Sequence, residues 1–566
     1  MNKVLLMPTA KLVGPELRSE FGAIPSAMIP LDSRPAMQYV AEPYLNRGYD
    51  LVLGVNERAD LVREYTDRHP AMGARLVHVP HTASLGETIL SVLDSLETDP
   101  ESLVINFADT YVGDELQGNN VICYREAGEV YRWTTFQIDF GNKITCLSDK
   151  DADNPYGQLQ PVFVGVFAVG NVSVFREHLR AALGAQPVDH TDPFYTALTE
   201  YFNALPADER RLQRVSDWRD FGHLDTYYQT KRAFCINQRF FNCVQIDGGR
   251  GIVRKSSKNA EKLLNEMKWY LELPKALRYM APRVFDYSFA KDEPFMEMEY
   301  YSYPALNDIY LYGNLDLSVW TRVFQAIGNV VRQMHSHRFQ PEDADHLGRS
   351  MRAMYEDKTR ARLRPVLEDT RFAAFCADWV VINGETCMGV RQCLDMLPRL
   401  AEALDMYSLD YFTVIHGDLC LSNILYDRRN SFIRVIDPRG EFGDAGIFGD
   451  MRYDLAKLSH SLEGDYDFMV NDMIDSAWSN GEYRHSAQLN ERHRNIKDLF
   501  HKWFLKEFGE HYMQVKLIES LLFLSMVPLH ADRFASQEAF LARGLEIFND
   551  VAAQAVLRQE RELATA

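Results

Sequence analysis

Residues 414–437 constrain the fold of this chain more than any other segment. They begin as Val-Ile-His-Gly-Asp and continue to Asn423, and a second apolar stretch, residues 433–436, leads to Asp437. Between the two stretches, residues 427–430 read Asp-Arg-Arg-Asn, which is typical of a turn. The pattern predicts a hairpin of two short strands that brings Asn423 and Asp437 to one end.

The three polar residues of this segment suit one kind of chemistry. Phosphoryl transfer needs a carboxylate that accepts or orients the hydroxyl proton of the acceptor, and an amide oxygen with a second carboxylate that hold Mg²⁺ against the nucleotide phosphates. Asp418, Asn423 and Asp437 match these roles in type, order and spacing. A lone Asp-x4-Asn occurs by chance in many proteins, so the hypothesis depends on the joint pattern.

The joint pattern, His416-Gly417-Asp418 with Asn423 and then Ile436-Asp437, resembles the aminoglycoside phosphotransferase and choline kinase family, a branch of the protein-kinase-like fold. The resemblance implies ATP as donor, Asp418 at the acceptor hydroxyl, and Asn423 and Asp437 as Mg²⁺ ligands. His416 is expected to orient the loop rather than to move protons. In residues 449–456, Asp454 is expected to brace the same loop, and Asp450 either has a role there or caps a helix. Cys420 is expected to serve packing.

The resemblance extends upstream of this segment. Lys255, at the end of residues 252–255, corresponds to the phosphate-binding lysine, although a lysine at a strand end is often only solvated. Glu266, eleven residues later on a predicted helix, is the expected ion-pair partner. Glu299 and Tyr301 fall where the hinge between two lobes would contact adenine through its backbone.

Two departures from kinase patterns refine the expectation. No G-x-G-x-x-G precedes the lysine, and only Gly248, Gly249 and Gly251 stand there; the family often lacks the full motif, so nucleotide binding is still expected. Asp437 is followed by Pro-Arg-Gly, and the activation-loop and Ala-Pro-Glu features of protein kinases are absent. A small-molecule acceptor, an alcohol or sugar, is therefore expected.

The chain is long enough for three or four domain-sized units at ~150 residues each. From 1 to about 180, short apolar runs alternate with helix-like stretches, which predicts a mainly parallel sheet covered by helices. From about 236, a hairpin over residues 240–255, a helix over 258–271 and a strand over 294–301 predict a small β-rich unit. Beyond about 305 the pattern is mostly helical, except in residues 411–437.

Residues 1 to about 232 resemble the sugar-phosphate and phosphocholine nucleotidyltransferases, which have a Rossmann-like α/β fold. Residues 24–37 follow that family's P-K-x-L-x-P segment. Asp109 lies at a strand end where the family places its first Mg²⁺ aspartate, and Asp220, in residues 217–223, matches the W-x-D-x-G segment that carries the second. The resemblance implies a Mg²⁺ pair that assists attack of a phosphate on a nucleoside triphosphate. A turn residue at 109 and a helix cap at 220 are the plainer interpretations.

Two elements that grip the triphosphate in that family differ here. Residues 7–14 contain one glycine instead of a glycine-rich loop, and Ser26 replaces the signature lysine. Lys11 or Arg18 could substitute. We therefore predict an α/β Rossmann-like domain (1–232) followed by an α+β bilobal kinase-like domain with an N-lobe (233–302) and a helical C-lobe (303–566).

Charge and composition indicate which classes of binding partner and which cellular locations are expected. The net charge of −19 disfavours nucleic acid. The apolar start is too short for a signal peptide, and the late apolar run at 521–529 is well short of the ~20 residues of a membrane span. The eight scattered cysteines include no CxxC pair, so we expect neither a zinc site nor a disulfide framework. We expect a cytoplasmic location. The sequence does not indicate an oligomeric state.

The hypothesis is a bifunctional enzyme that phosphorylates a small alcohol or sugar with ATP and then couples the product to a second nucleotide, CTP or UTP. Such pairs resemble those that make precursors of bacterial surface polysaccharides. Three alternatives stay open: a kinase whose degenerate N-terminal domain only binds a nucleotide or partner, an N-terminal metal-dependent glycosyltransferase, and a non-catalytic scaffold.

Overall fold

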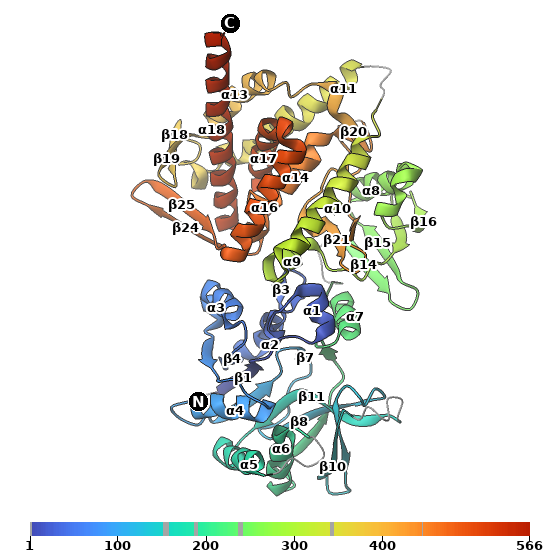
Figure 1. Cartoon of the computed structure of the whole chain (residues 1–566), viewed down its shortest axis with the longest axis vertical. Helices are drawn as coiled ribbons and strands as arrows, with labels where there is room; N and C mark the ends of the chain where they lie inside the picture. The colour runs from blue at the N-terminus through green and yellow to red at the C-terminus, as the bar shows by residue number, and fades with distance from the viewer. Residues whose placement is uncertain are drawn as a thin grey trace. The chain divides into compact units, whose positions relative to one another are not determined.

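The computed structural model describes residues 3–150, 158–185, 191–235, 242–339, 344–443 and 445–565 (Figure 1). The chain forms two compact units. One contains Met1–Phe234 and Tyr312–Asn314, and the other contains Cys235–Leu311 and Leu315–Ala566. Each unit has its own sheet and helices, and each is described separately below.

Half of the N-terminal sheet is parallel. Strands β6 (Ser102–Asn106), β1 (Lys3–Thr9), β4 (Asp50–Val55) and β5 (Arg75–His78) lie side by side in that order with the same direction. The helices of this half include α2 (Ala36–Leu45), α3 (Ala59–Arg68) and α4 (Leu85–Asp94). Strands β6, β1 and β4 are almost wholly apolar and buried, as the alternation of apolar runs with helical stretches predicted, whereas β5 is only partly buried.

The other half of the sheet is mostly antiparallel, with one parallel strand pair, so the prediction of a mainly parallel sheet holds only for part of it. Strand β11 (Gln160–Val169) runs antiparallel to β6. It also pairs antiparallel with β8 (Val121–Ala127) and β9 (Thr134–Ile138), while β10 (Ile144–Asp149) continues the edge. A buried apolar run shows that a strand is central but not its direction. The chain between β6 and β11 forms strands rather than a crossover helix, which permits the antiparallel pairing.

Further elements complete this unit. Strand β12 (Arg211–Arg214) runs parallel to β8 and pairs with it, and β13 (Trp218–Asp220) pairs with β7 (Thr110–Val112) in a separate ribbon. Its remaining helices are α1 (Pro15–Phe21), α5 (Val172–Gly184), α6 (Pro193–Ala204) and α7 (Leu224–Cys235). Phe167, Phe175 and Phe194 contribute to the core where β11 meets α5 and α6.

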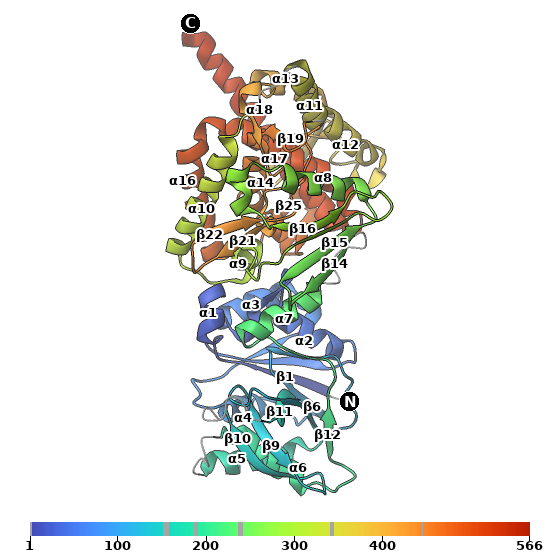
Figure 2. The ribbon, with the colours of Figure 1, turned by 90° about the vertical axis from the view of Figure 1, so that its right-hand side faces the viewer.

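The C-terminal unit begins with a four-stranded antiparallel sheet in the order β14 (Asn242–Asp247), β15 (Ile252–Ser257), β17 (Phe295–Glu299) and β16 (Val284–Ser288). Helix α8 (Ala260–Glu272) follows β15 (Figure 2). The hairpin, helix and last strand lie where they were predicted, although residues 240–241 of the hairpin are outside the described residues. Strand β16 was not predicted.

The helical part of this unit contains two short antiparallel strand pairs. Strands β21 (Ile424–Asp427) and β22 (Phe432–Val435) form the predicted hairpin, and β20 (Phe412–Val414) pairs with β23 (Phe448–Asp450). The helices are α9 (Leu306–Tyr312), α10 (Leu317–His335), α11 (Ala344–Arg352), α12 (Lys358–Glu368), α13 (Val390–Ala403), α14 (Met451–Leu462), α15 (Tyr466–Val470), α16 (Glu491–Phe508), α17 (Tyr512–Met526) and α18 (Phe534–Thr565).

A second sheet in this region was not predicted. Strands β19 (Glu385–Met388), β18 (Trp379–Ile382), β25 (Glu482–Ala487) and β24 (Ile474–Ser479) lie in that order. Each of its two hairpins turns on an Asn-Gly pair with positive φ at both residues, at 383–384 and 480–481. Asn-Gly is a strong signal for a two-residue hairpin turn, so the sequence did contain this information.

Within the part of the chain that the structure describes, one stretch, Glu491–His530, has the length and composition of a membrane span. It comprises α16 and α17, and 67% of its most apolar window is buried inside this unit. Helix α17 packs between α14 and α18 (Figure 1). The stretch therefore has the surroundings of a core helix of a globular fold.

Candidate functional site

The loop between β20 and β21, residues 415–423, brings together the polar residues of the sequence motif. Pairing of Ile424 with Val435 starts the hairpin, and the Ile436 amide donates to the Asn423 carbonyl at 3.0 Å. Asn423 Nδ2 donates to the backbone oxygen of Asp418 at 2.9 Å and to its Oδ2 at 3.2 Å. Asp437 follows directly after β22, so Asn423 and Asp437 lie at the same end of the hairpin, as predicted, and Asn423 is bonded to Asp418.

Asp454 and His416 position this loop through hydrogen bonds to its backbone and to the backbone just after β22. The Asp454 carboxylate, fully buried on α14, accepts hydrogen bonds from the amides of His416 (2.7 Å) and Gly417 (2.8 Å). The buried His416 ring contacts the Ile436 carbonyl through Nε2 at 3.0 Å. Burial lowers the pKa of His416 to about 4, so the ring is neutral near pH 7. Both side chains lie where loop positioning requires them.

Lys255 joins the N-terminal sheet of this unit to the hairpin. Its buried Nζ lies 2.7 Å from Glu266 Oε1 on α8 and 2.9 Å from Asp437 Oδ1. Burial opposes the charge on Lys255, but Asp437 and Glu266 raise its pKa, so the lysine stays protonated. Asp437, with φ of 56°, is held in the left-handed region, and the same lysine lowers its pKa against the effect of burial.

Helix α8 is fixed against the loop by close backbone packing. Gly440 has φ of 71°, and a Cβ there would lie 2.0 Å from the Asn265 carbonyl oxygen. The Trp269 indole donates to the Ile415 carbonyl at 2.7 Å. These contacts set the position of Glu266 relative to Asp437, so the ion-pair triad follows from how α8 packs.

Lys457 was not predicted as a site residue. Its Nζ lies 2.9 Å from Asp418 Oδ1, and its side chain is 14% exposed. Burial alone would raise the pKa of Asp418, but Lys457 lowers it to about 2. Lys457 lies three residues after Asp454 on α14, a spacing that places both on one helix face, and this is the signal that could have identified it.

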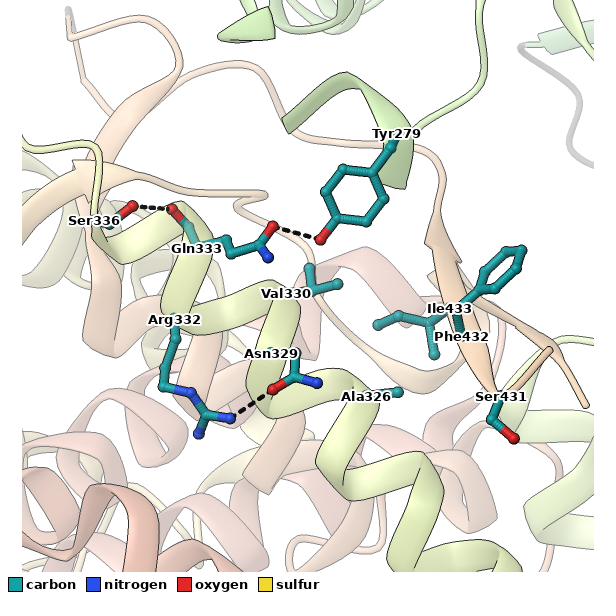
Figure 3. Close-up of a pocket in the computed structure, with 10 residues that line it drawn as sticks. All are labelled: Tyr279, Ala326, Asn329, Val330, Arg332, Gln333, Ser336, Ser431, Phe432 and Ile433. Atoms are coloured by element: carbon teal, nitrogen blue, oxygen red, sulfur yellow. Dashed lines mark hydrogen bonds between the residues drawn. The ribbon is translucent and has the colours of Figure 1, made fainter. Parts of the chain in front are cut away.

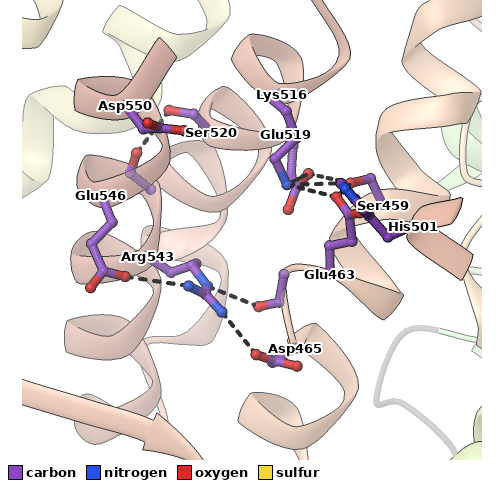
Figure 4. Close-up of polar contacts among 12 residues, drawn as sticks. Ser459, Glu463, Asp465, His501, Lys516, Glu519, Ser520, Arg543, Glu546 and Asp550 are labelled. Carbon is purple, nitrogen blue, oxygen red and sulfur yellow. Dashed lines mark hydrogen bonds and ion pairs between the residues drawn. The ribbon is translucent and has the colours of Figure 1, made fainter. Parts of the chain in front are cut away.

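A network of buried ion pairs fixes α14, the helix that carries Asp454 and Lys457. Ser459 Oγ donates to Glu519 Oε2 at 2.5 Å, and Lys516 Nζ lies 2.6 Å from the same carboxylate and 3.2 Å from Glu463. Farther along, Arg543 pairs with Asp465 at 2.8 Å (Figure 4). The pairs connect α14 to α17 and α18, and breaking a buried pair is strongly destabilising.

Asn423 and Asp437 fit a hard divalent cation. The hydrogen bonds that Asn423 makes with its side chain use the amide nitrogen, which leaves Oδ1 for a ligand, and the Asp437 side chain is 54% exposed. Mg²⁺ prefers oxygen donors and takes few protein ligands, completing its shell with phosphates and water. Among the described residues, no group of three or more His, Cys, Asp and Glu is placed to hold a metal ion.

Glu299 and Tyr301 lie at and just beyond the end of β17. The Glu299 amide donates to the Arg283 carbonyl at 2.9 Å, and the Tyr300 amide donates to the Gly251 carbonyl at 2.8 Å. The Tyr301 hydroxyl donates to Glu299 Oε2 at 2.7 Å. Two of the three backbone N–H groups of residues 299–301 are therefore used within this unit.

Asp109 and Asp220 lie against one another in the N-terminal unit. The Phe221 amide donates to the Asp109 carbonyl at 2.8 Å, and Asp220 pairs with Thr110 across the β7–β13 ribbon. A Cβ placed on Gly222 would lie 3.1 Å from Asp109 Oδ2 and 3.4 Å from Asp220 Oδ1, so both carboxylates border one small space. Burial and the charge of Asp220 raise the pKa of Asp109 to about 6. We call these two residues the carboxylate pair.

Within the described residues, His223, Thr226 and Lys150 lie near the carboxylate pair. His223 Nδ1 and Thr226 Oγ1 contact Asp220 Oδ2 at 2.8 and 2.5 Å. Lys150, which was not predicted, follows β10, and its charge, like that of His223, lowers the pKa of Asp109. Two adjacent carboxylates repel unless a proton or cation lies between them, so the pair fits Mg²⁺.

Lys11 and Arg18 are both exposed. Lys11 follows β1 and Asp109 follows β6, and these strands are parallel neighbours, so both residues lie at the same edge of the sheet. Arg18 lies on α1, and Ser26 begins a short 3₁₀ helix, Ser26–Met28. No contact joins Lys11 or Arg18 to the carboxylate pair within the described residues.

A cavity of about 490 Å³ lies elsewhere in the C-terminal unit, beside α10 (Figure 3). Tyr279 donates from its hydroxyl to Gln333 across it at 2.5 Å, and Phe432 and Ile433 of β22 form another wall. None of the candidate site residues named above lines this cavity, so we do not assign the reaction to it.

Comparison with known proteins gave one family. Residues 237–489 match the phosphotransferase enzyme family. The C-terminal region therefore belongs to that family, which confirms the resemblance drawn from residues 416–437, and the chain is an enzyme of the transferase class. No curated protein matches the chain.

Solved structures give weaker likenesses. HddC from Yersinia pseudotuberculosis, in a complex described with GMP-PN, is 15% identical with a TM-score of 0.30, over 41% of this chain and all of that chain. LicC from Streptococcus pneumoniae, described as a CTP:phosphocholine cytidylyltransferase, is 13% identical with a TM-score of 0.34, over 41% and 100% of the two chains. These scores are too low to assign an activity to the N-terminal unit, whose Rossmann-like α/β architecture is evident from its own sheet.

Proposed function

We propose that the C-terminal unit transfers the γ-phosphoryl group of ATP to the hydroxyl of a small alcohol or sugar. The arrangement of Asp418, Asn423 and Asp437 at one end of the hairpin, with Lys255 bonded to Asp437, is the observation that carries the proposal. The acceptor oxygen forms a bond to the γ-phosphorus as the bond to the β–γ bridging oxygen breaks and ADP leaves.

Each residue has a role that follows from its contacts. Asp418 orients the acceptor hydroxyl; because its pKa is about 2, it is a weak base and takes the proton late, when the hydroxyl oxygen is already bonding to phosphorus. Lys255, positioned by Glu266, binds nucleotide phosphates, and Tyr301 contacts the base. Asn423 and Asp437 would hold Mg²⁺, which neutralises charge on the phosphates. His416 and Asp454 position the loop.

For the N-terminal unit we propose nucleotidyl transfer to the phosphorylated product. A phosphate oxygen of that product attacks the α-phosphorus of a second nucleoside triphosphate, CTP or UTP, and pyrophosphate leaves. Asp109 and Asp220 would hold Mg²⁺, which offsets the negative charge that gathers on the phosphates. Lys11, Arg18 or Lys150 would supply the cationic contact that Ser26 cannot make.

The two steps form a sequence, since the product of the first is the substrate of the second. We infer from this a cytoplasmic enzyme that makes an activated precursor, as in the synthesis of surface polysaccharides. Ser26 and the missing glycine loop favour one alternative: a kinase whose N-terminal unit binds a nucleotide without turning it over. An N-terminal glycosyltransferase would instead bind UDP-sugars in preference to triphosphates.

Phosphorus NMR tests the whole proposal. The full chain is mixed with Mg²⁺, ATP, CTP or UTP, and a panel of alcohols and sugars. Formation of ADP with a new phosphomonoester supports the first step, and pyrophosphate with a new diphosphate diester supports the second. Formation of a phosphomonoester without pyrophosphate, for every nucleotide base, would favour the kinase-only alternative. If ADP forms no faster than with Asp418→Asn, whichever acceptor is added, the kinase proposal is rejected.

A further inference from the structure

Three cations converge near Asp418 and Tyr453. Lys457 of α14 contacts Asp418 Oδ1 at 2.9 Å. Arg439, two residues after Asp437, places Nη1 3.1 Å from the hydroxyl of Tyr453, and Lys358, the first residue of α12, lies with Nζ 5.8 Å from the centre of the same ring. We call Lys358, Arg439 and Lys457 the cation cluster.

The cation cluster is not balanced by nearby carboxylates. Asp418 offsets Lys457, and Glu441 lies 3.5 Å from Arg439, but Lys358 forms no ion pair within the described residues. Asp454, the other carboxylate nearby, points both of its oxygens at amides of the loop. Positive charge is therefore in excess here, although the chain as a whole carries −19.

The titration of the neighbouring groups reflects this excess. Burial lowers the pKa of Lys358, and the charges of Arg439 and Lys457 lower it further. Burial alone would raise the pKa of Tyr453, but the cation cluster lowers it to about 8. Gathering like charges in a partly buried site costs free energy, and such arrangements are typical of sites that bind an opposite charge.

The cluster is held in place by the loop itself. The Arg439 amide donates to the His416 carbonyl at 2.9 Å. Gly417 has φ of 77°, and a Cβ there would lie 2.8 Å from Arg439 Cβ, so the arginine backbone packs directly on the loop. The side chains stay partly accessible: 42% for Asp418, 26% for Arg439 and 14% for Lys457.

The cluster differs from the groups that we assign to the nucleotide. Lys255 reaches Asp437 from β15, whereas Lys457 reaches Asp418 from α14 and Lys358 comes from α12. Asp418 has one carboxylate oxygen against Lys457 and the other against Asn423. It therefore separates the nucleotide side of the site from the cation cluster.

We propose that Lys358, Arg439 and Lys457 bind an anionic group of the acceptor, so that the substrate is an alcohol that carries a carboxylate or a phosphate close to the reacting hydroxyl. The inference rests on the proposed kinase reaction and narrows its acceptor to an anionic class. Arginine binds either group through paired N–H donors, and lysine does so as a point charge.

Matched acceptors test the charge preference. ADP formation by the full chain is measured at saturating MgATP with sets that differ only in charge: glycerol, glycerate and glycerol phosphate, and a hexose with its uronic acid and hexose phosphate. We expect the anionic member of a set to show a kcat/KM at least about tenfold above the neutral one, which is about 1.4 kcal/mol. The carboxylate and phosphate arms show which anion is bound.

The Lys358→Gln variant tests the residues. We expect the KM for the anionic acceptor to rise about tenfold with little change in the KM for ATP, and Lys358→Arg to recover most of the loss. Lys506→Gln, on the exposed face of α16, is the matched control and should behave as the unchanged protein.

Each other outcome has a defined meaning. If neutral or cationic acceptors are turned over as well as or better than anionic ones, the proposal of an anionic acceptor is wrong, while the proposed kinase reaction is still supported. A change in the KM for ATP in Lys358→Gln, without one for the acceptor, overturns it too, because the lysine then serves the nucleotide. Absence of ADP formation above the level of Asp418→Asn with every acceptor rejects the kinase reaction and the inference together.

Discussion

The carboxylates of the two units are neutralised in different ways. In the C-terminal unit, Asp418 pairs with Lys457 and Asp437 pairs with Lys255, so the pKa of each aspartate is lowered. In the N-terminal unit, Asp109 and Asp220 face one another, His223 and Thr226 contact Asp220, and the pKa of Asp109 is raised.

The two sites therefore differ in how their carboxylates are charged before a phosphate ligand binds. The C-terminal site carries its own counter-charges, so Asp418 and Asp437 are ionised and oriented before a ligand arrives. The carboxylate pair is strained electrostatically by itself and is relieved when a cation binds. Four experiments would sharpen or break this contrast.

The largest effect is expected for Asp418→Asn. The substitution removes the group that orients the acceptor hydroxyl and takes its proton but keeps the residues of the nucleotide side, so kcat should fall by about 10³-fold or more while ATP affinity is kept. Initial rates and ATP titrations measure both quantities. Asp410→Asn, on an exposed residue nearby, is the control. Full activity in Asp418→Asn would remove Asp418 from the mechanism.

A smaller effect is expected for Asp220→Asn in the N-terminal unit. Loss of one member of the carboxylate pair should weaken Mn²⁺ binding by at least about 10–100-fold. Calorimetric titration in an Asp437→Ala background, which weakens the C-terminal metal site, isolates this binding. The exposed Asp208→Asn is the matched control. Unchanged Mn²⁺ affinity would mean that the pair is structural.

Lys457→Met should change the pH profile. With Lys457 present the pKa of Asp418 is about 2, so activity should not depend on its protonation at pH 5. Without the lysine, burial raises that pKa, and the variant should lose about tenfold in kcat/KM as pH falls from 7 to 5. Lys457→Arg should restore the flat profile. Because Lys457 also belongs to the cation cluster, a loss that is equal at all pH values is expected in addition. A profile that shows only this equal loss would mean that Lys457 does not set the protonation of Asp418.

The smallest effect concerns stability. Ser84 caps α4 by accepting a hydrogen bond from the Glu87 amide at 3.1 Å, and Ser84→Ala should destabilise the N-terminal unit by about 1 kcal/mol. Asn490→Ala, which removes the capping box of α16, is the counterpart in the C-terminal unit. Thermal unfolding should show each variant shifting a different transition. Equal shifts of one shared transition would show that the units unfold together.

Local spacing was enough to predict much of the C-terminal unit. The hairpin around residues 427–430, the helix that carries Glu266 and the bracing contact of Asp454 all lie where the motif placed them. The Asn-Gly hairpins at 383–384 and 480–481 were equally visible in the sequence but were overlooked within a mostly helical region. In the N-terminal unit, apolar runs located the strands but not their directions.

The sequence by itself determined the spacing of Asp418, Asn423 and Asp437, because a short loop and a two-stranded hairpin leave little freedom over twenty residues. Only the tertiary structure decided what surrounds them. Lys457, Arg439 and Lys358 meet at Asp418 and Tyr453 from three separate elements, and Asp109 meets Asp220 across a ribbon closed over more than a hundred residues. Such contacts depend on how helices and strands pack, and packing is set by the whole core rather than by local preference.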